Sequence, residues 1–137
     1  MNFANILSGG HTLYLPAAVT TIVFLLAWLP SSIAKYQQKG TKFLLGNRSD
    51  TSALSGWGGR SIRAYENWKS YFPGYIMAVV LLSIKGGITP LMVNLCWAYL
   101  GARVLHMMFY CMGNPTLRFL SFLVSMVINF YLLFKLM

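Results

Sequence analysis

The sequence contains little charge and almost no acidic residues. Charged side chains make up 9% of the 137 residues, and only two of them are acidic. Soluble domains average about 25% charged residues. A chain that is 57% hydrophobic lacks the polar surface needed to cover its core in water. The composition excludes an ordinary soluble domain and predicts a single integral membrane domain over residues 1–137, in contact with membrane lipids.

Cysteine is scarce as well, and no recognised metal or nucleotide motif occurs in the sequence. Cys96 and Cys111 fall in one predicted helix, fifteen residues apart, which separates them by about 22 Å. That distance is too long for a disulfide. No Cys or His spacing resembles a zinc site, and no phosphate-binding loop or hydrolase signature is present. We therefore expect neither a disulfide framework nor a bound metal.

The excess of basic residues gives a clue to orientation. Eleven Lys and Arg residues give a formal net charge of +9, which in a soluble protein would suggest a nucleic-acid partner. In a membrane protein it is explained by the positive-inside rule, and no nucleic acid is expected. Residues 1–30 hold no Lys or Arg, whereas five basic residues lie in or beside one polar connection: Lys35, Lys39, Lys42, Arg48 and Arg60. This bias predicts that the connection is cytoplasmic and that both termini lie on the other side.

Four apolar stretches predict four membrane spans, at about residues 13–34, 60–84, 89–110 and 116–136. A polar connection over residues 35–59 separates the first two. Thr89 before Pro90, and Asn114 before Pro115, are typical of a capped helix start with proline at its first position. The expected fold is all-α, an integral membrane bundle of four antiparallel helices.

Polar residues recur at helical spacing within three of these spans. The sets are Arg63, Glu66, Asn67, Ser70 and Tyr71; Tyr99, Arg103, His106 and Tyr110; and Arg118, Ser121, Ser125 and Asn129. This spacing predicts one polar face on each helix. Because an ionisable group at mid-bilayer costs about 2.5–3.5 kcal/mol on insertion scales, such residues are candidates for function.

The alternating direction of the spans brings seven of these side chains to the same membrane face: Arg60, Arg63, Asn67, Arg103, His106, Tyr110 and Arg118. Four guanidinium groups would form a pocket for a small anionic ligand, since they match carboxylates bidentately. The alternative is that arginines reach lipid headgroups or pair with Glu66 inside the bundle. That alternative explains Arg60 and Arg118 better than Arg103, which lies two turns inside its span.

Two segments resemble one known family. The stretch RAYENWKSYFP, residues 63–73, resembles the second-helix signature of the MAPEG proteins, the membrane-associated proteins of eicosanoid and glutathione metabolism. The stretch ARVLHMMFYCMGNPTLRFLSF, residues 102–122, is similar to the joined third and fourth helices of bacterial members. Together the segments cover 32 residues. The likeness implies a four-helix membrane protein, commonly a homotrimer, here in a bacterial inner membrane.

The resemblance also implies a ligand and roles for single residues. The best-known members of the family bind glutathione between neighbouring subunits, which implies contacts from Arg60, Arg63, Asn67, Tyr71, Arg103 and Tyr110. His106 stands where the eukaryotic enzymes often have tyrosine and joins the ligand-binding set. Arg118 matches the arginine that stabilises the glutathione thiolate. In one departure, Ser70 replaces the glutamate of the family signature, and Glu66 lies one turn earlier.

Two functional hypotheses follow. The first is a glutathione-dependent transferase or peroxidase acting on lipophilic electrophiles, in which Arg118 assists thiolate formation without a metal. The alternative is a non-catalytic accessory or structural subunit that packs against other membrane proteins or lipid. Arg103 and Arg118 at one membrane face favour the first hypothesis. Ser70 and the uncharged first span favour the second.

Overall fold

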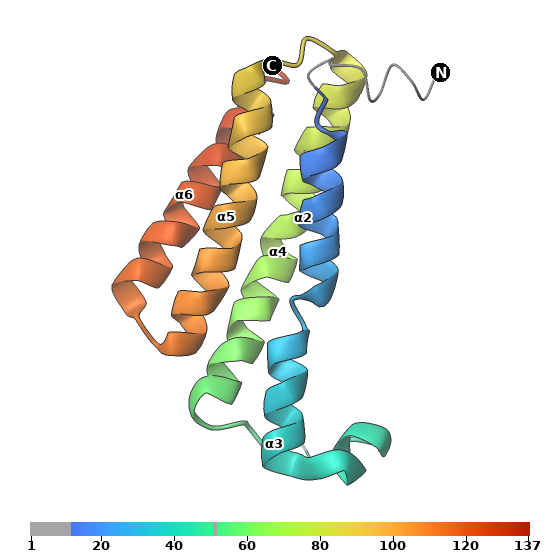
Figure 1. Cartoon of the computed structure of the whole chain (residues 1–137), viewed down its shortest axis with the longest axis vertical. Helices are drawn as coiled ribbons and strands as arrows, with labels where there is room; N and C mark the ends of the chain where they lie inside the picture. Colours follow the sequence, from blue (N-terminus) through green and yellow to red (C-terminus); the bar gives the residue numbers. More distant parts are fainter. Residues whose placement is uncertain (1–11, 51) are drawn as a thin grey trace.

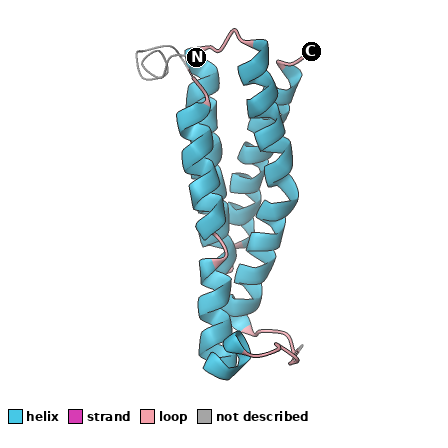
Figure 2. Cartoon of the chain, turned by 90° about the vertical axis from the view of Figure 1, so that its right-hand side faces the viewer, coloured by secondary structure: helices cyan, strands magenta, loops and turns pink. Residues whose placement is uncertain are grey.

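The chain forms a bundle of long helices running along one axis. The structure is a computed structural model that describes residues 12–50 and 52–137. Within those residues it contains helices and no strands (Figures 1 and 2). The helices are α2 (Tyr14–Leu26), α3 (Leu29–Leu45), α4 (Gly56–Lys85), α5 (Pro90–Met112) and α6 (Pro115–Phe134). The predicted all-α class is confirmed.

The first predicted span is built from α2 and α3. The helix is interrupted at Ala27 and Trp28, next to Pro30 in the first turn of α3, where proline cannot donate a backbone hydrogen bond. Helical structure then continues to Leu45, past the predicted end of the span at residue 34. The polar connection predicted over residues 35–59 is therefore mostly helix in its first half. Its lysines and glutamines are good helix formers, and their polarity concealed this at the sequence level.

Three helical stretches are long and apolar enough to cross a membrane, namely Tyr14–Leu45, Pro90–Met112 and Pro115–Phe134. Helix α4 is not among them, although it has 30 residues. Its first half carries Arg60, Arg63, Glu66 and Lys69, which lower its hydropathy. A helix of this polarity is favourable in a bilayer only where other helices cover it.

The two predicted helix starts are confirmed. The Thr89 side chain accepts a hydrogen bond from the backbone N–H of Met92 at 3.3 Å, and the Asn114 side chain accepts one from Leu117 at 3.0 Å. Gly113 ends α5 with φ +82°, the left-handed conformation that lets the chain turn back at once. This short turn holds the end of α5 against the start of α6.

The two ends of the bundle are formed by different segments of the chain. At one end, the start of α2 lies near the C-terminus, and Lys85 Nζ donates to the carbonyl oxygens of Lys135 at 3.0 Å and Leu136 at 3.1 Å (Figure 1). The core towards this end includes the stacked rings of Tyr75 and Tyr99, with centroids 3.9 Å apart. The basic end of α3 lies at the other end. Cys96 and Cys111 both lie on α5, as predicted, and both are free thiols in the structure.

Candidate anion-binding site

Arg103 is the centre of a buried polar cluster between α4, α5 and α6. Its side chain is on α5 and only 1% exposed. Nη1 donates to Oδ1 of Asn67 at 3.3 Å and to Oγ of Ser125 at 3.5 Å. Nη2 donates to the backbone carbonyl of Asn67 at 3.2 Å. Three helices are thus joined through one guanidinium group.

Aromatic rings surround the rest of this guanidinium. Its central carbon lies 5.8 Å from the ring centroids of Trp68 and Tyr71 and 6.0 Å from that of Phe122. Ring faces attract cations at such distances. Nε of Arg103 is buried and has no hydrogen-bond partner among the described residues. The charge is therefore held by neutral groups.

Neither acidic residue of the chain neutralises Arg103. Glu66 pairs with Lys69, with 2.9 Å between Oε2 and Nζ, and Asp50 pairs with Lys39, with 3.2 Å between Oδ2 and Nζ. Both carboxylates are exposed. The pairing of Glu66 with an arginine inside the bundle, considered from the sequence, is wrong for the described residues, because Glu66 lies on the open side of α4 beside Lys69.

A second group of arginines lies nearby, at the turn between α5 and α6. Here Arg60 and Arg118 line a hollow of about 130 Å³ together with Tyr110. The central carbon of the Arg118 guanidinium is 4.6 Å from the Tyr110 ring centroid. Nε of Arg60 donates to the carbonyl of Cys111 at 3.1 Å. No acidic residue lines this hollow, so its chemistry favours a small anion.

His106 connects the two groups. It is buried, and its Nδ1 lies 2.9 Å from the backbone carbonyl oxygen of Arg118. Its ring centroid lies 5.5 Å from that of Tyr110 and 5.7 Å from that of Phe122. The imidazole therefore belongs at once to the surroundings of Arg103 and to those of Arg118.

The structure divides the polar face predicted for the second span. Asn67 and Tyr71 are partly buried, and both lie against the Arg103 cluster. Arg63, Glu66 and Ser70 are exposed. The five positions spread over about 140° of the helix circumference, too wide for one contact with α5 and α6. Arg63 therefore joins neither group within one chain.

Sequence reasoning missed three residues of the Arg103 cluster: Trp68, Phe122 and Ser125. Ser125 was placed on a polar stripe but not in the site. The two aromatic residues resemble ordinary core residues, and only their position beside a buried cation distinguishes them. A signal was available at Trp68, which directly follows Asn67.

Comparison with known proteins shows the family of this chain. The family model described as MAPEG family matches residues 15–137. Comparison with curated proteins and with solved structures gives no match. The matched region contains all of α3, α4, α5 and α6, all of α2 except Tyr14, and every residue of both arginine groups. The chain therefore belongs to the MAPEG family, whose members are membrane proteins.

Proposed function

We propose that this protein is a glutathione-dependent transferase or peroxidase that acts on lipophilic electrophiles, with glutathione as co-substrate. The observation that carries the proposal is the hollow between Arg60, Tyr110 and Arg118, which has two guanidinium groups and no acidic residue. Family membership supports glutathione as the anion. The family is known for glutathione-related transferase and peroxidase roles.

In the proposed transferase reaction, Arg118 stabilises the thiolate of glutathione. A free thiol has a pKa of about 8.5, and each unit by which a neighbouring cation lowers it corresponds to about 1.4 kcal/mol. The thiol proton passes to water. The sulfur then forms a bond to the electrophilic carbon while the bond from that carbon to its leaving group breaks. No covalent intermediate with the protein is needed.

Binding of the tripeptide is assigned to the remaining site residues: Arg60, Arg63, Asn67, Tyr71, Arg103, His106 and Tyr110. A hollow of about 130 Å³ is small beside ordinary ligand pockets, which are about 300–1,000 Å³. It has room for the thiol end of the ligand only. The rest would lie over the open side of α4, where Arg63 is exposed.

That open side also supports a homotrimer. Arg63, Glu66 and Ser70 form an exposed polar strip on a helix of a membrane protein, which is costly against lipid. A neighbouring copy would cover the strip and close the glutathione site. We further assign the protein to a bacterial inner membrane, with the basic end of the bundle in the cytoplasm and both termini opposite.

The decisive experiment measures glutathione binding by calorimetry and the absorbance of the bound thiolate. We expect wild-type protein to bind glutathione and to show the thiolate band. Arg118→Ala should bind but lose the band, whereas Arg63→Ala and Arg103→Ala should bind more weakly. Arg48→Ala is the matched control, because it removes an arginine from another part of the chain. Absence of binding, or a thiolate band unchanged in Arg118→Ala, would overturn the proposal.

One observation favours the second candidate, a non-catalytic accessory subunit that packs against other membrane proteins. Three hydrogen bonds join the Arg103 guanidinium to Asn67 and Ser125 of the same chain, as expected for a group that only holds helices together. A fixed stoichiometry with unrelated membrane subunits, together with no glutathione binding, would establish this role.

A further inference from the structure

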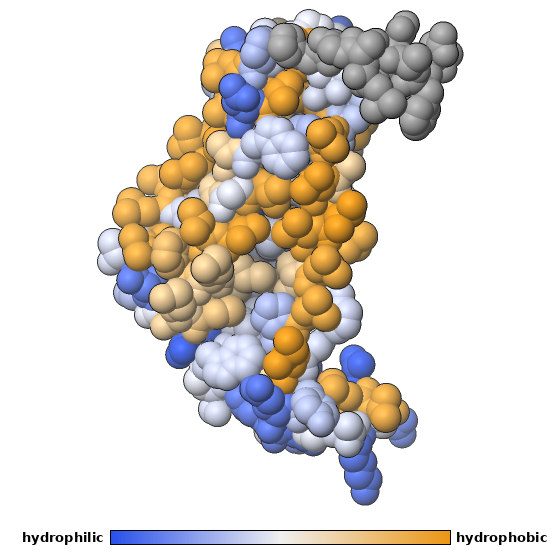
Figure 3. Space-filling view, in the orientation of Figure 1, coloured by the Kyte–Doolittle hydropathy of each residue, from blue (hydrophilic) through white to orange (hydrophobic). Residues whose placement is uncertain are grey.

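The end of α3 turns away from the bundle, and this last part of the helix contains apolar and basic residues. Gly40 has φ +74°, a conformation that glycine adopts at little cost, and the helix changes direction there (Figure 1). We call residues 41–45 the foot. Leu45 is 88% exposed, and Lys42 is exposed beside it. Figure 3 shows an apolar patch among hydrophilic side chains in this region.

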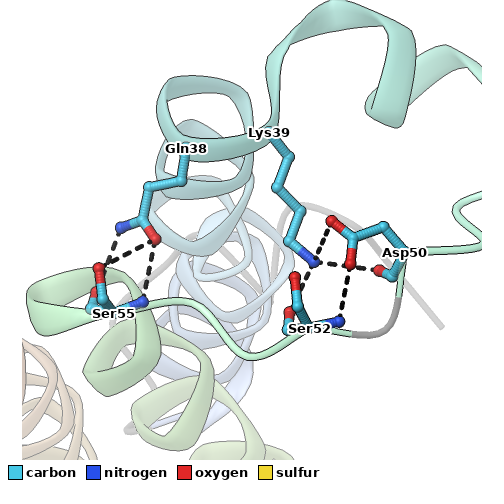
Figure 4. A network of polar contacts seen from close by, with 5 residues as sticks. All are labelled: Gln38, Lys39, Asp50, Ser52 and Ser55. Atoms are coloured by element: carbon cyan, nitrogen blue, oxygen red, sulfur yellow. Dashed lines mark hydrogen bonds and ion pairs between the residues drawn. The ribbon is translucent and has the colours of Figure 1, made fainter.

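Two sets of hydrogen bonds join α3 to residues of the connection between α3 and α4 (Figure 4). The Gln38 amide accepts from the backbone N–H of Ser55 at 2.9 Å and donates to its carbonyl at 3.2 Å. Lys39 Nζ donates to the carbonyl of Ser52 at 2.6 Å and to that of Asp50 at 3.0 Å. Asp50, Ser52 and Ser55 are therefore held beside α3.

A hollow of about 420 Å³ lies beside the foot and is lined by Lys42, Phe43, Arg48 and Asp50, among others. The Asp50 carboxylate is already paired with Lys39. The side chains of Lys42 and Arg48 have no ion-pair or hydrogen-bond partner among the described residues. Arg48 also has φ +52°, which is uncommon for a residue other than glycine. Two cations thus line one hollow without a counter-ion.

The surroundings of the hollow indicate which anion it fits. A soluble phosphate would meet Lys42 and Arg48 but would make no use of the apolar side chains of Phe43 and Leu45. A phospholipid supplies both an anionic phosphate and acyl chains. Basic residues near a membrane surface attract anionic lipids. The chain belongs to a family of membrane proteins, and the foot lies at one end of its helical bundle.

We propose that the hollow beside the foot is a binding site for the headgroup of an anionic phospholipid. Lys42 and Arg48 bind the phosphate, while Leu45 enters the boundary between headgroups and acyl chains. None of the residues that line this hollow lines the hollow at Arg118, and the site does not require glutathione. It would fix the depth of the basic end of the bundle in the membrane.

The test uses the full chain in neutral detergent with phosphatidylglycerol or phosphatidylcholine of the same acyl chains. Native mass spectrometry measures how much of each lipid the protein retains. We expect wild-type protein to prefer phosphatidylglycerol. Because each basic residue near an anionic surface contributes about 1 kcal/mol, Lys42→Gln and Arg48→Gln should each weaken that preference about fivefold. Arg48→Lys, which keeps the charge, should retain most of it.

The control combines Lys85→Gln with Lys135→Gln, which removes two charges from the opposite end of the bundle. It should leave the preference unchanged. Equal retention of both lipids by wild-type protein would overturn the proposal, as would an equal loss in the control. Glycerol phosphate is added as a competitor; if it displaces phosphatidylglycerol at equal concentration, the site binds soluble phosphates and the assignment to lipid is wrong. Glutathione is absent throughout, so failure of the enzymatic proposal would not affect this result.

Discussion

Nδ1 of His106 lies 2.9 Å from the backbone carbonyl oxygen of Arg118, across the turn that joins α5 to α6. A carbonyl oxygen only accepts hydrogen bonds, so this contact requires the hydrogen to be on Nδ1. Oγ of Ser121 lies 3.0 Å from the same carbonyl oxygen and 2.8 Å from that of Leu117, so its single hydrogen is shared between the two. The backbone that carries Arg118 is therefore held from two sides, which positions the guanidinium over Tyr110.

Replacement of His106 should loosen this turn. His106→Leu removes the donor that α5 supplies to the Arg118 carbonyl and should destabilise the fold by about 1 kcal/mol. Unfolding in sodium dodecyl sulfate, followed by circular dichroism, measures the change. His106→Gln keeps a donor of similar reach and should lose less. If the leucine variant is as stable as wild type, the contact with Arg118 does not stabilise the turn.

Gly113→Ala should disturb Arg60. Gly113 has φ +82°, and a Cβ there would lie 3.3 Å from Nε and Cζ of the Arg60 guanidinium. The left-handed backbone alone should cost about 1 kcal/mol with alanine. We expect a lower unfolding midpoint and weaker binding of glutathione, because Arg60 must move out of the hollow.

Gly101→Ala is the matched control for that substitution. Gly101 lies inside α5, and a Cβ there would meet nothing within 4 Å. Alanine has the higher helix propensity, so this variant should be as stable as wild type or more stable by up to about 1 kcal/mol. Equal effects of the two substitutions would show that the turn at Gly113 has no special requirement.

The sequence was sufficient to predict local features of the fold. The helix starts at Thr89 and Asn114 depend only on a capping residue followed by proline, and both are present. The buried stripe of Arg103 and His106 on α5 follows from helical periodicity. The course of α3 did not follow, because a polar surface helix and a polar loop have the same composition here.

The partners within the site were harder to predict than its members. Helical spacing placed Asn67 and Arg63 on one face, but only packing decides which edge of that face meets α5. Likewise, Glu66 was an attractive partner for an arginine until the structure placed Lys69 beside it. Periodicity gives the direction of a side chain to within a wide sector, whereas ion pairing depends on a few ångströms.

Asp50 should titrate at unusually low pH. Hydrogen bonds from Ser52, and then Lys39, lower the pKa of this carboxyl from its ordinary value to about 2. A lowered pKa means that the ionised form stabilises the folded connection. This contribution is fully present above the unfolded pKa of about 3.9 and is lost as the pH falls through about 2.

Carbon-13 NMR of the Asp50 carboxyl in detergent micelles would measure this titration. Lys39→Met removes one of the two partners, so the midpoint should move up towards the ordinary value while the Ser52 contribution remains. A midpoint near the ordinary value in wild-type protein would show that the fastening seen between Lys39, Asp50 and Ser52 does not persist in solution.

The assembly can be tested at the open side of α4. Ser70 is exposed there, on the strip that also carries Arg63 and Glu66. If three copies bury this strip against one another, Ser70→Trp overfills the contact and should convert the trimer to monomer in native mass spectrometry. Leu123→Trp is the control, since Leu123 is an exposed apolar residue on α6 and the larger ring should remain in lipid.

Because the glutathione site is proposed to be completed by a neighbouring copy, Ser70→Trp should lose glutathione binding together with the trimer, whereas Leu123→Trp should keep both. A wild-type protein that is monomeric yet binds glutathione would disprove the shared site.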